Sequence, residues 1–155
     1  MKSIYNHLVD WGEVDPDFIF LNYDKSYTIS DVIYQVDTIS KSLEYIPDSY
    51  IGIHINSSID IIFLYLACMK TNKTPILFQT SWSKHELDYL INKYKITHII
   101  SEWKSKNLFD QDATIYYLEE LINSSRGCGV PIHSDSNSNP ECILFTSGST
   151  GFPKA

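Results

Sequence analysis

The stretch IGIHINSSIDIIFLYLACMKTNKTPILF, residues 51–78, joins two short, largely apolar runs through a longer apolar one. The outer runs, 49–55 and 74–78, have the length and composition of single strands. The central run, 57–72, is apolar on nearly every side, which predicts a deeply buried helix. Asn72 stands where that helix ends, and asparagine tolerates the left-handed backbone that often follows a helix. A strand, a helix and a strand in this order predict parallel pairing through a right-handed crossover.

The same alternation continues toward the C-terminus. SKHE, from Ser83 to Glu86, fits a capping box and predicts a helix that runs to about Lys93. Three further runs have strand composition: 97–101, 113–118 and 141–145. Strands that alternate with helices indicate an α/β fold, a mainly parallel sheet flanked by helices.

Two other elements are expected before residue 49. Residues 18–30 read as a small N-terminal hairpin, with Asp24 and Lys25 at the bend. Residues 30–43 have apolar positions at spacings of three and four, which predicts an amphipathic helix with Ser30 as its N-cap. Residues 123–140 are rich in Ser, Asn, Gly and Pro and are expected to form a surface linker within one domain.

Composition narrows the function. The 155 residues carry 43% hydrophobic side chains, as a globular protein does, and a formal charge of −7. Arg126 is the only arginine, so nucleic acid is not an expected partner. Three widely spaced cysteines without a CxxC pair indicate neither a disulfide framework nor a zinc site. No secretory signal is visible and no apolar run approaches the ~20 residues that span a bilayer, so we expect no membrane span and a cytoplasmic location.

The final stretch, ILFTSGSTGFPKA at residues 143–155, has the composition of an anion-binding loop. It follows an expected strand, and ligands in open α/β sheets bind beyond the carboxyl ends of the strands. Glycines let the backbone present its N–H groups, hydroxyls add donors, and Lys154 adds a positive charge. Composition of this kind is mostly found in plain loops. It also differs from the G-x-x-x-x-G-K-[ST] loop of common NTPases, which would need Gly at Pro153.

The string FTSGSTGFPKA resembles the phosphate-loop signature of the adenylate-forming (AMP-binding) superfamily, [YF]-T-S-G-[ST]-T-G-x-P-K-G. Ala155 replaces the final Gly. A weaker resemblance covers most of the chain, including YTISDVIYQVDTISKSL at 27–43. Two departures stand out: Asn72 replaces a helix-ending Gly, and residues 77–80 read LFQT where the family has Pro-Leu-Asp-Pro.

The resemblance implies that residues 1–155 are part of an N-terminal AMP-binding domain that is truncated just after its phosphate loop. Such enzymes use ATP and Mg²⁺ to convert a carboxylic acid to an acyl-adenylate, then transfer the acyl group to a thiol of coenzyme A or of a phosphopantetheine arm on a carrier protein. The residues expected to bind ATP phosphates are Thr146, Ser147, Gly148, Ser149, Thr150, Gly151 and Lys154, with Ser149 also expected at the metal.

No catalytic residue is assigned, and the 155 residues alone are expected to be inactive. Two alternatives stay open: a noncatalytic phosphate-binding or interaction module, and a gene fragment without a function of its own. Other residues have simpler interpretations. His54 is expected to be a packed strand histidine, and HELDY from His85 a surface helix turn, because Tyr89 stands where a zinc-protease helix needs histidine.

Overall fold

The computed structural model describes residues 3–105, 107–109, 113–123 and 142–145. Its elements, in chain order, are α1 (Ile4–Val14), β1 (Ile19–Asn22), β2 (Ser26–Thr28), α2 (Ile29–Leu43), β3 (Tyr50–His54), α3 (Ser58–Lys70), β4 (Thr74–Leu77), α4 (Lys84–Tyr94), β5 (His98–Ser101), the 3-10 turn η1 (Trp103–Ser105), β6 (Thr114–Tyr117) and α5 (Leu118–Asn123).

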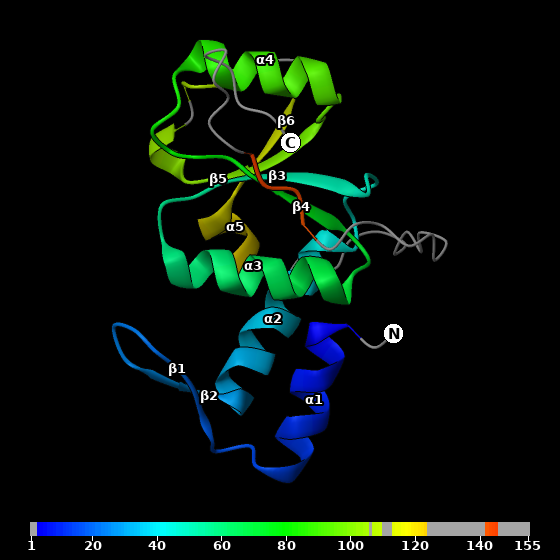
Figure 1. The fold of residues 1–155 in the computed structure, drawn as a ribbon, viewed down its shortest axis with the longest axis vertical. Helices are drawn as coiled ribbons and strands as arrows, with labels where there is room; N and C mark the ends of the chain where they lie inside the picture. The colour runs from blue at the N-terminus through cyan, green and yellow to red at the C-terminus, as the bar shows by residue number, and fades with distance from the viewer. Residues whose placement is uncertain (1–2, 106, 110–112, 124–141, 146–155) are drawn as a thin grey trace.

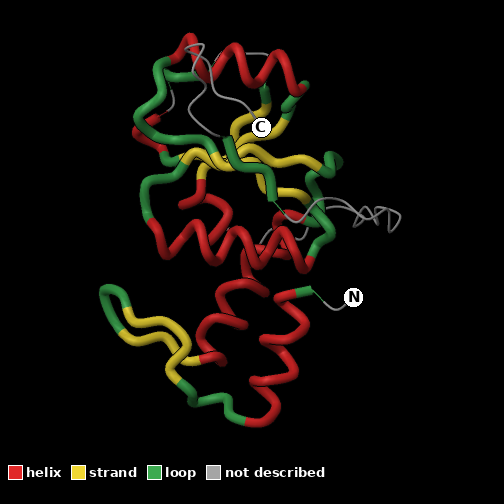
Figure 2. The backbone as a smooth tube through the Cα atoms, viewed as in Figure 1, coloured by secondary structure: helices red, strands yellow, loops and turns green. Residues whose placement is uncertain are grey.

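The sheet is parallel and has the strand order β4-β3-β5-β6. Figure 1 shows α4 on one face of it and α3 with α5 on the other, while α1, α2 and the β1–β2 hairpin extend the molecule on the α3 side. The strands form a thin layer between these helices in Figure 2. This confirms the predicted α/β class, the parallel pairing and the small antiparallel N-terminal hairpin.

Alternating side chains of β3 divide the core. Ile51 and Ile53 are at most 1% exposed and belong to the cluster that packs against α2 and α3. The opposite face packs on α4 and contains Ile76, Phe78 and Ile99. Gly52 lies under this second cluster, where a Cβ would stand 2.8 Å from a ring carbon of Phe78. The absence of a side chain at Gly52 therefore gives the Phe78 ring its place on the sheet.

The helix ends agree in part with the sequence. Asn72 has a φ of 53°, and Ser83 and Glu86 form the expected capping box at the start of α4. Ser30 is not the N-cap of α2, so that prediction is wrong. Thr28 caps the helix in a reciprocal capping box with Asp31, two residues earlier than expected. The Ser30 hydroxyl instead donates to the carbonyl oxygen of Pro16 at 3.1 Å.

Two helices were not predicted. The first is α1, which is capped by Ser3 and contributes Tyr5 and Leu8 to the core. The Tyr5 hydroxyl donates to the Asp37 carboxylate of α2 at 2.9 Å, and Lys70 of α3 pairs with the same carboxylate at 2.6 Å. The second is α5, which begins directly after β6 and buries Leu118 and Leu121. The linker was expected at residues 123–140. Its first residue, Asn123, is the last residue of α5, and residues 124–140 lie outside the described residues.

A Gly52→Ala substitution tests the close approach of Phe78. The new Cβ would meet a ring carbon at 2.8 Å and Ile99 at 3.1 Å, and an aromatic ring held in a core cannot bend away. We expect a loss of about 1–3 kcal/mol in the free energy of unfolding, measured by urea denaturation.

Gly12→Ala is the matched control. Its Cβ would lie 2.9 Å from the Ile29 methyl and 3.0 Å from the Ile33 δ-methyl, but alanine in α1 gains up to about 1 kcal/mol of helix propensity. We expect a smaller loss there. Wild-type stability in Gly52→Ala would contradict the packing described for Phe78.

Candidate functional site

The structure describes the approach to the predicted phosphate loop rather than the loop. All seven predicted binding residues fall in the range 146–155, outside the described residues. Their roles therefore stay predictions. The four residues that precede them, 142–145, are described.

Residues 142–145 run beside β4 at the outer edge of the sheet. Ile143 forms a parallel bridge with Ile76. The Ile143 N–H donates to the Pro75 carbonyl at 2.9 Å, and the Leu77 N–H donates to the Ile143 carbonyl at 3.2 Å. The predicted fifth strand is thus a single bridge, shorter than expected. Because the pairing is parallel, the segment leads toward the carboxyl ends of the strands, as the sequence indicated.

Phe145, the last described residue, is enclosed by aromatic side chains. Its ring centroid lies 6.2 Å from that of Phe78, with 15° between the planes. The Trp82 and Tyr94 centroids lie 5.7 Å and 5.4 Å away. We call Phe78, Trp82 and Tyr94 the aromatic clamp. Phe145 is 8% exposed, whereas the neighbouring Leu144 is 62% exposed, so Phe145 is the side chain that the segment buries.

A pocket of about 280 Å³ adjoins the clamp. It is lined by Tyr50, Ile76, Tyr94, Ile143 and Phe145. None of these side chains carries a charge, so the pocket offers no cation to a phosphate and is separate in chemistry from the predicted loop.

Polar groups join the carboxyl ends of the three strands nearest to this segment. After β3, the Asn56 N–H donates to the Glu102 carboxylate at 2.8 Å, and the Asn56 side chain accepts from Thr80 at 3.4 Å. Lys104 pairs with Glu102 at 2.5 Å. Burial alone would raise the pKa of Glu102, but the bonds from Lys104 and from the N–H groups of Asn56 and Ser57 outweigh it, so the pKa lies below its usual value. Glu102 therefore ties the end of β5 to the start of α3.

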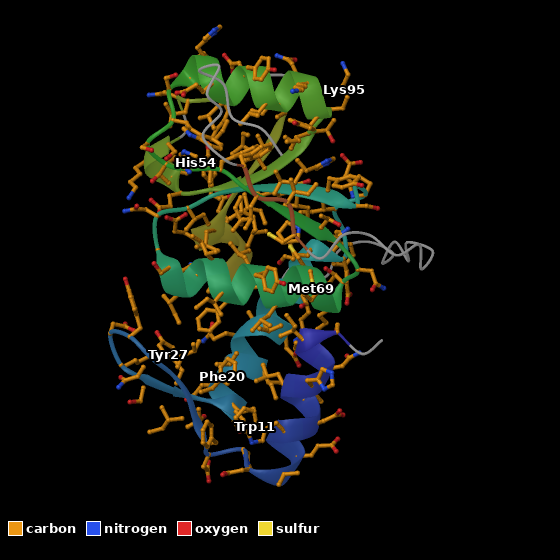
Figure 3. All side chains as sticks on the ribbon, viewed as in Figure 1. Trp11, Phe20, Tyr27, His54, Met69 and Lys95 are labelled. Carbon is orange, nitrogen blue, oxygen red and sulfur yellow. The ribbon has the colours of Figure 1, made fainter. Side chains whose placement is uncertain are left out.

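His54 ends β3 and is 2% exposed. Figure 3 shows it toward one end of the sheet, with Lys95, which precedes β5, toward the other. The His54 ring packs edge-on against Phe109, with 5.3 Å between the ring centroids, and the His54 Nδ1 lies 3.5 Å from the Ser101 hydroxyl. Among the described residues, its Nε2 has no hydrogen-bond partner. Burial lowers the pKa of His54, which is the behaviour of a packed, neutral histidine.

The described residues offer no metal site, since no group of three His, Cys, Asp or Glu side chains gathers among them. Cys68 and Cys142 are free, and burial raises the pKa of Cys68 to about 12, so this thiol is inert at neutral pH. Nor does the described part of the chain contain a helix of the length and hydropathy that a membrane crossing requires.

Comparison with known proteins agrees with the fold described above. The family model described as "AMP-binding enzyme" matches residues 8–155. The chain belongs to the AMP-binding enzyme family. VraA of Staphylococcus aureus is 27% identical over 157 residues, which cover all of this chain and 31% of VraA. The match extends over the predicted loop, so the family assignment includes the residues that the sequence singled out.

Solved structures show the same fold. The N-terminal subdomain of NpsA from Klebsiella oxytoca, in complex with 3-hydroxyanthranilyl-AMSN, superimposes with a TM-score of 0.78 at 20% identity, covering 99% of this chain and 39% of that one. The o-succinylbenzoate coenzyme A synthetase MenE of Bacillus subtilis, in complex with ATP and magnesium ion, gives 0.78 at 16% identity, covering 95% and 41%. The chain spans less than a third of the length of the curated relatives it matches first.

No pattern in the sequence predicts the aromatic clamp. Trp82 lies just before α4 and Tyr94 is its last residue, and their spacing of twelve positions matches no recognised motif.

The buried position of His54 predicts a pH-dependent stability. Its pKa is lowered from an ordinary value near 6.5, so the unfolded chain takes up a proton there that the folded chain refuses. The free energy of unfolding should therefore fall as the pH drops below about 6.5. Urea denaturation between pH 8 and pH 5.5 measures this.

His54→Gln should remove that part of the pH dependence, because glutamine does not titrate. His85→Gln is the control, since His85 is exposed on α4, and it should follow the wild type. A His54→Gln curve parallel to the wild type would show that His54 is protonated equally in both states.

Proposed function

We propose that this chain carries the phosphate-binding part of an enzyme that activates a carboxylic acid with ATP and passes the acyl group to a thiol. The acyl-adenylate is the intermediate, pyrophosphate is the leaving group, and the acceptor is coenzyme A or a phosphopantetheine arm. The observation that carries the proposal is the family match over residues 8–155, which includes the run FTSGSTGFPKA. The reported complexes of MenE with ATP and magnesium ion, and of NpsA with 3-hydroxyanthranilyl-AMSN, support it.

The described residues fit a nucleotide ligand at this place. The bridge between Ile143 and Ile76 directs the chain toward the carboxyl ends of β4 and β3. The described chain ends at Phe145, beside the sheet edge where α/β folds bind ligands, and this supports the proposed role of the residues that follow it in the sequence. The buried Phe145 side chain fixes the end of the described segment 142–145 on the sheet.

In this proposal the loop acts on the leaving group. Backbone N–H groups around Gly148 and Gly151 and the Lys154 ammonium hold the β- and γ-phosphates. Negative charge accumulates on pyrophosphate as the α-phosphate is attacked, so donors that already point at it lower the barrier. Bound Mg²⁺ supplies further charge neutralisation, and the Ser149 hydroxyl is its proposed ligand in this segment.

We further propose that the reaction belongs to a polypeptide longer than these 155 residues. The solved NpsA and MenE chains are matched over only 39% and 41% of their length. The purified 155-residue chain should accordingly release no pyrophosphate from ATP with any carboxylic acid. Turnover by this chain, with contaminating ligases excluded, would contradict that part of the proposal.

Lys154→Ala, made in the complete enzyme, tests the role of the loop. Charge-assisted bonds to phosphate are about twice as strong as neutral ones. If the Lys154 bond tightens as pyrophosphate leaves, its loss should slow adenylation by roughly 10–1000-fold, about 1.4–4 kcal/mol. Thiol transfer from preformed acyl-adenylate involves neither the β- nor the γ-phosphate, so it should be nearly unchanged. Single-turnover assays of the two half-reactions measure the difference.

Two companion variants sharpen this test. Gly148→Val should impair adenylation for another reason, because a β-branched side chain obstructs close approach of the backbone to phosphate. Lys41→Ala removes the same charge from an exposed position in the last turn of α2 and should leave both half-reactions unchanged. Equal losses in both half-reactions for Lys154→Ala would assign the loop to folding and not to phosphate binding.

A further inference from the structure

Among the described residues, the segment 142–145 that leads into the predicted loop bonds to the sheet through the backbone of Ile143. Two hydrogen bonds join Ile143 to β4, at 2.9 Å and 3.2 Å. On the outer side of β4 the next donor toward the N-terminus would be the N–H of residue 75, and Pro75 has none. β4 therefore cannot extend a regular ladder along this segment in that direction. Within the described residues 142–145, side-chain packing adds to the two bonds of Ile143.

Phe145 provides that packing. It is 8% exposed and has three aromatic rings within 6.2 Å, centroid to centroid. Leu144 points the other way and is 62% exposed, and Cys142 is half-buried. The segment thus has one well-buried aromatic side chain, at the position that directly precedes the predicted phosphate loop.

The three residues of the aromatic clamp lie next to or within β4 and α4. Phe78 follows β4, bonds through its N–H to the Ile53 carbonyl at 2.9 Å, and occupies the space above Gly52. Trp82 directly precedes Ser83, the N-cap of α4, and Tyr94 is the last residue of that helix. Phe145 therefore contacts the chain just before α4 and the end of α4, and also the residue that follows β4.

We propose that Phe145 is a positioning residue for the phosphate loop: the aromatic clamp fixes the place and direction in which the chain leaves the sheet, and so preorganises the donors of residues 146–154 for the polyphosphate of Mg·ATP. This rests on the proposed function. A loop that reaches its binding-competent arrangement only part of the time binds with an affinity reduced by that fraction. Loss of the clamp should therefore weaken nucleotide binding without removing any group that touches nucleotide.

The same contacts make Trp82 a reporter. Its ring lies 5.7 Å from that of Phe145, so ligand-induced changes next to Phe145 alter its surroundings. The chain has three tryptophans, and Trp11 and Trp103 are 43% and 54% exposed. Replacing these two by phenylalanine leaves Trp82 as the sole tryptophan.

The experiment measures Mg·ATP binding to the 155-residue chain by Trp82 emission and, independently, by equilibrium dialysis. Phe145→Leu removes the ring and keeps an apolar side chain, whereas Phe145→Tyr keeps the ring. Phe109→Leu is the matched control: Phe109 belongs to the same core cluster and is 9% exposed, but it packs on His54. Circular dichroism and urea denaturation establish that each variant is folded.

We expect Phe145→Leu to weaken Mg·ATP binding roughly tenfold, a factor that corresponds to a competent fraction of about one in ten. Phe145→Tyr and Phe109→Leu should stay within about twofold of the wild type. If Phe145→Leu does not fold, Trp82→Leu removes the clamp from the other side, at a half-buried position, and dialysis should show the same loss.

Three results would overturn the inference. Wild-type affinity in a folded Phe145→Leu or Trp82→Leu variant would mean that the clamp does not position the loop, and would leave the proposed function standing. Equal weakening in Phe145→Leu and Phe109→Leu would assign the effect to general loosening of the core. Absence of Mg·ATP binding by the wild type would overturn the proposed phosphate loop itself, and the positioning role with it.

Discussion

Parallel pairing between β3 and β4 requires both strands to start at one edge of the sheet and to end at the other, and α3 must return the chain between them. The position of the segment that leads into the predicted loop depends on this pairing. Because Ile143 pairs parallel with Ile76 of β4, the segment 142–145 arrives at the same carboxyl edge as β3 and β4. The side chains that face α4 then determine what holds that segment, and Gly52 makes room among them for Phe78.

Much of the fold could be predicted because the decisive signals are local. The apolar run of α3 and its Asn72 ending, the capping box at Ser83, and the four short strands are all present in contiguous sequence. Ser30 stands just before the apolar repeat, and this position alone predicts it as the cap of α2. Thr28 is the cap instead, because the carboxylate of Asp31, three residues later, accepts a hydrogen bond from the Thr28 backbone N–H. α1 is not predicted from the sequence because it buries only Tyr5 and Leu8, and their burial depends on packing against α2 and α3.

The candidate site likewise has one part that the sequence predicts and one part that it does not. The phosphate loop was predictable because its motif is a continuous string, and the family match covers it. The aromatic clamp was not, because it brings residues 78, 82 and 94 together around Phe145, which is distant from them in the sequence. The short pairing at Ile143 could likewise not be predicted from residues 141–145 alone. It depends on the partner strand β4, in which Pro75 has no N–H to donate. Continuous signals predict chemistry here, and the contacts that would position this chemistry come from the tertiary fold.

The proposed function and the proposed role of Phe145 both require that the chain after Phe145 binds the polyphosphate of a nucleotide. A crystal structure of this chain with Mg²⁺ and a non-hydrolysable ATP analogue tests it most directly. We expect β- and γ-phosphate oxygens about 2.7–3.1 Å from backbone N–H groups of residues 146–151 and from the Lys154 ammonium, with the Phe145 ring packed in the aromatic clamp. Phosphates bound elsewhere on the chain, with no contact to residues 146–154, would contradict it.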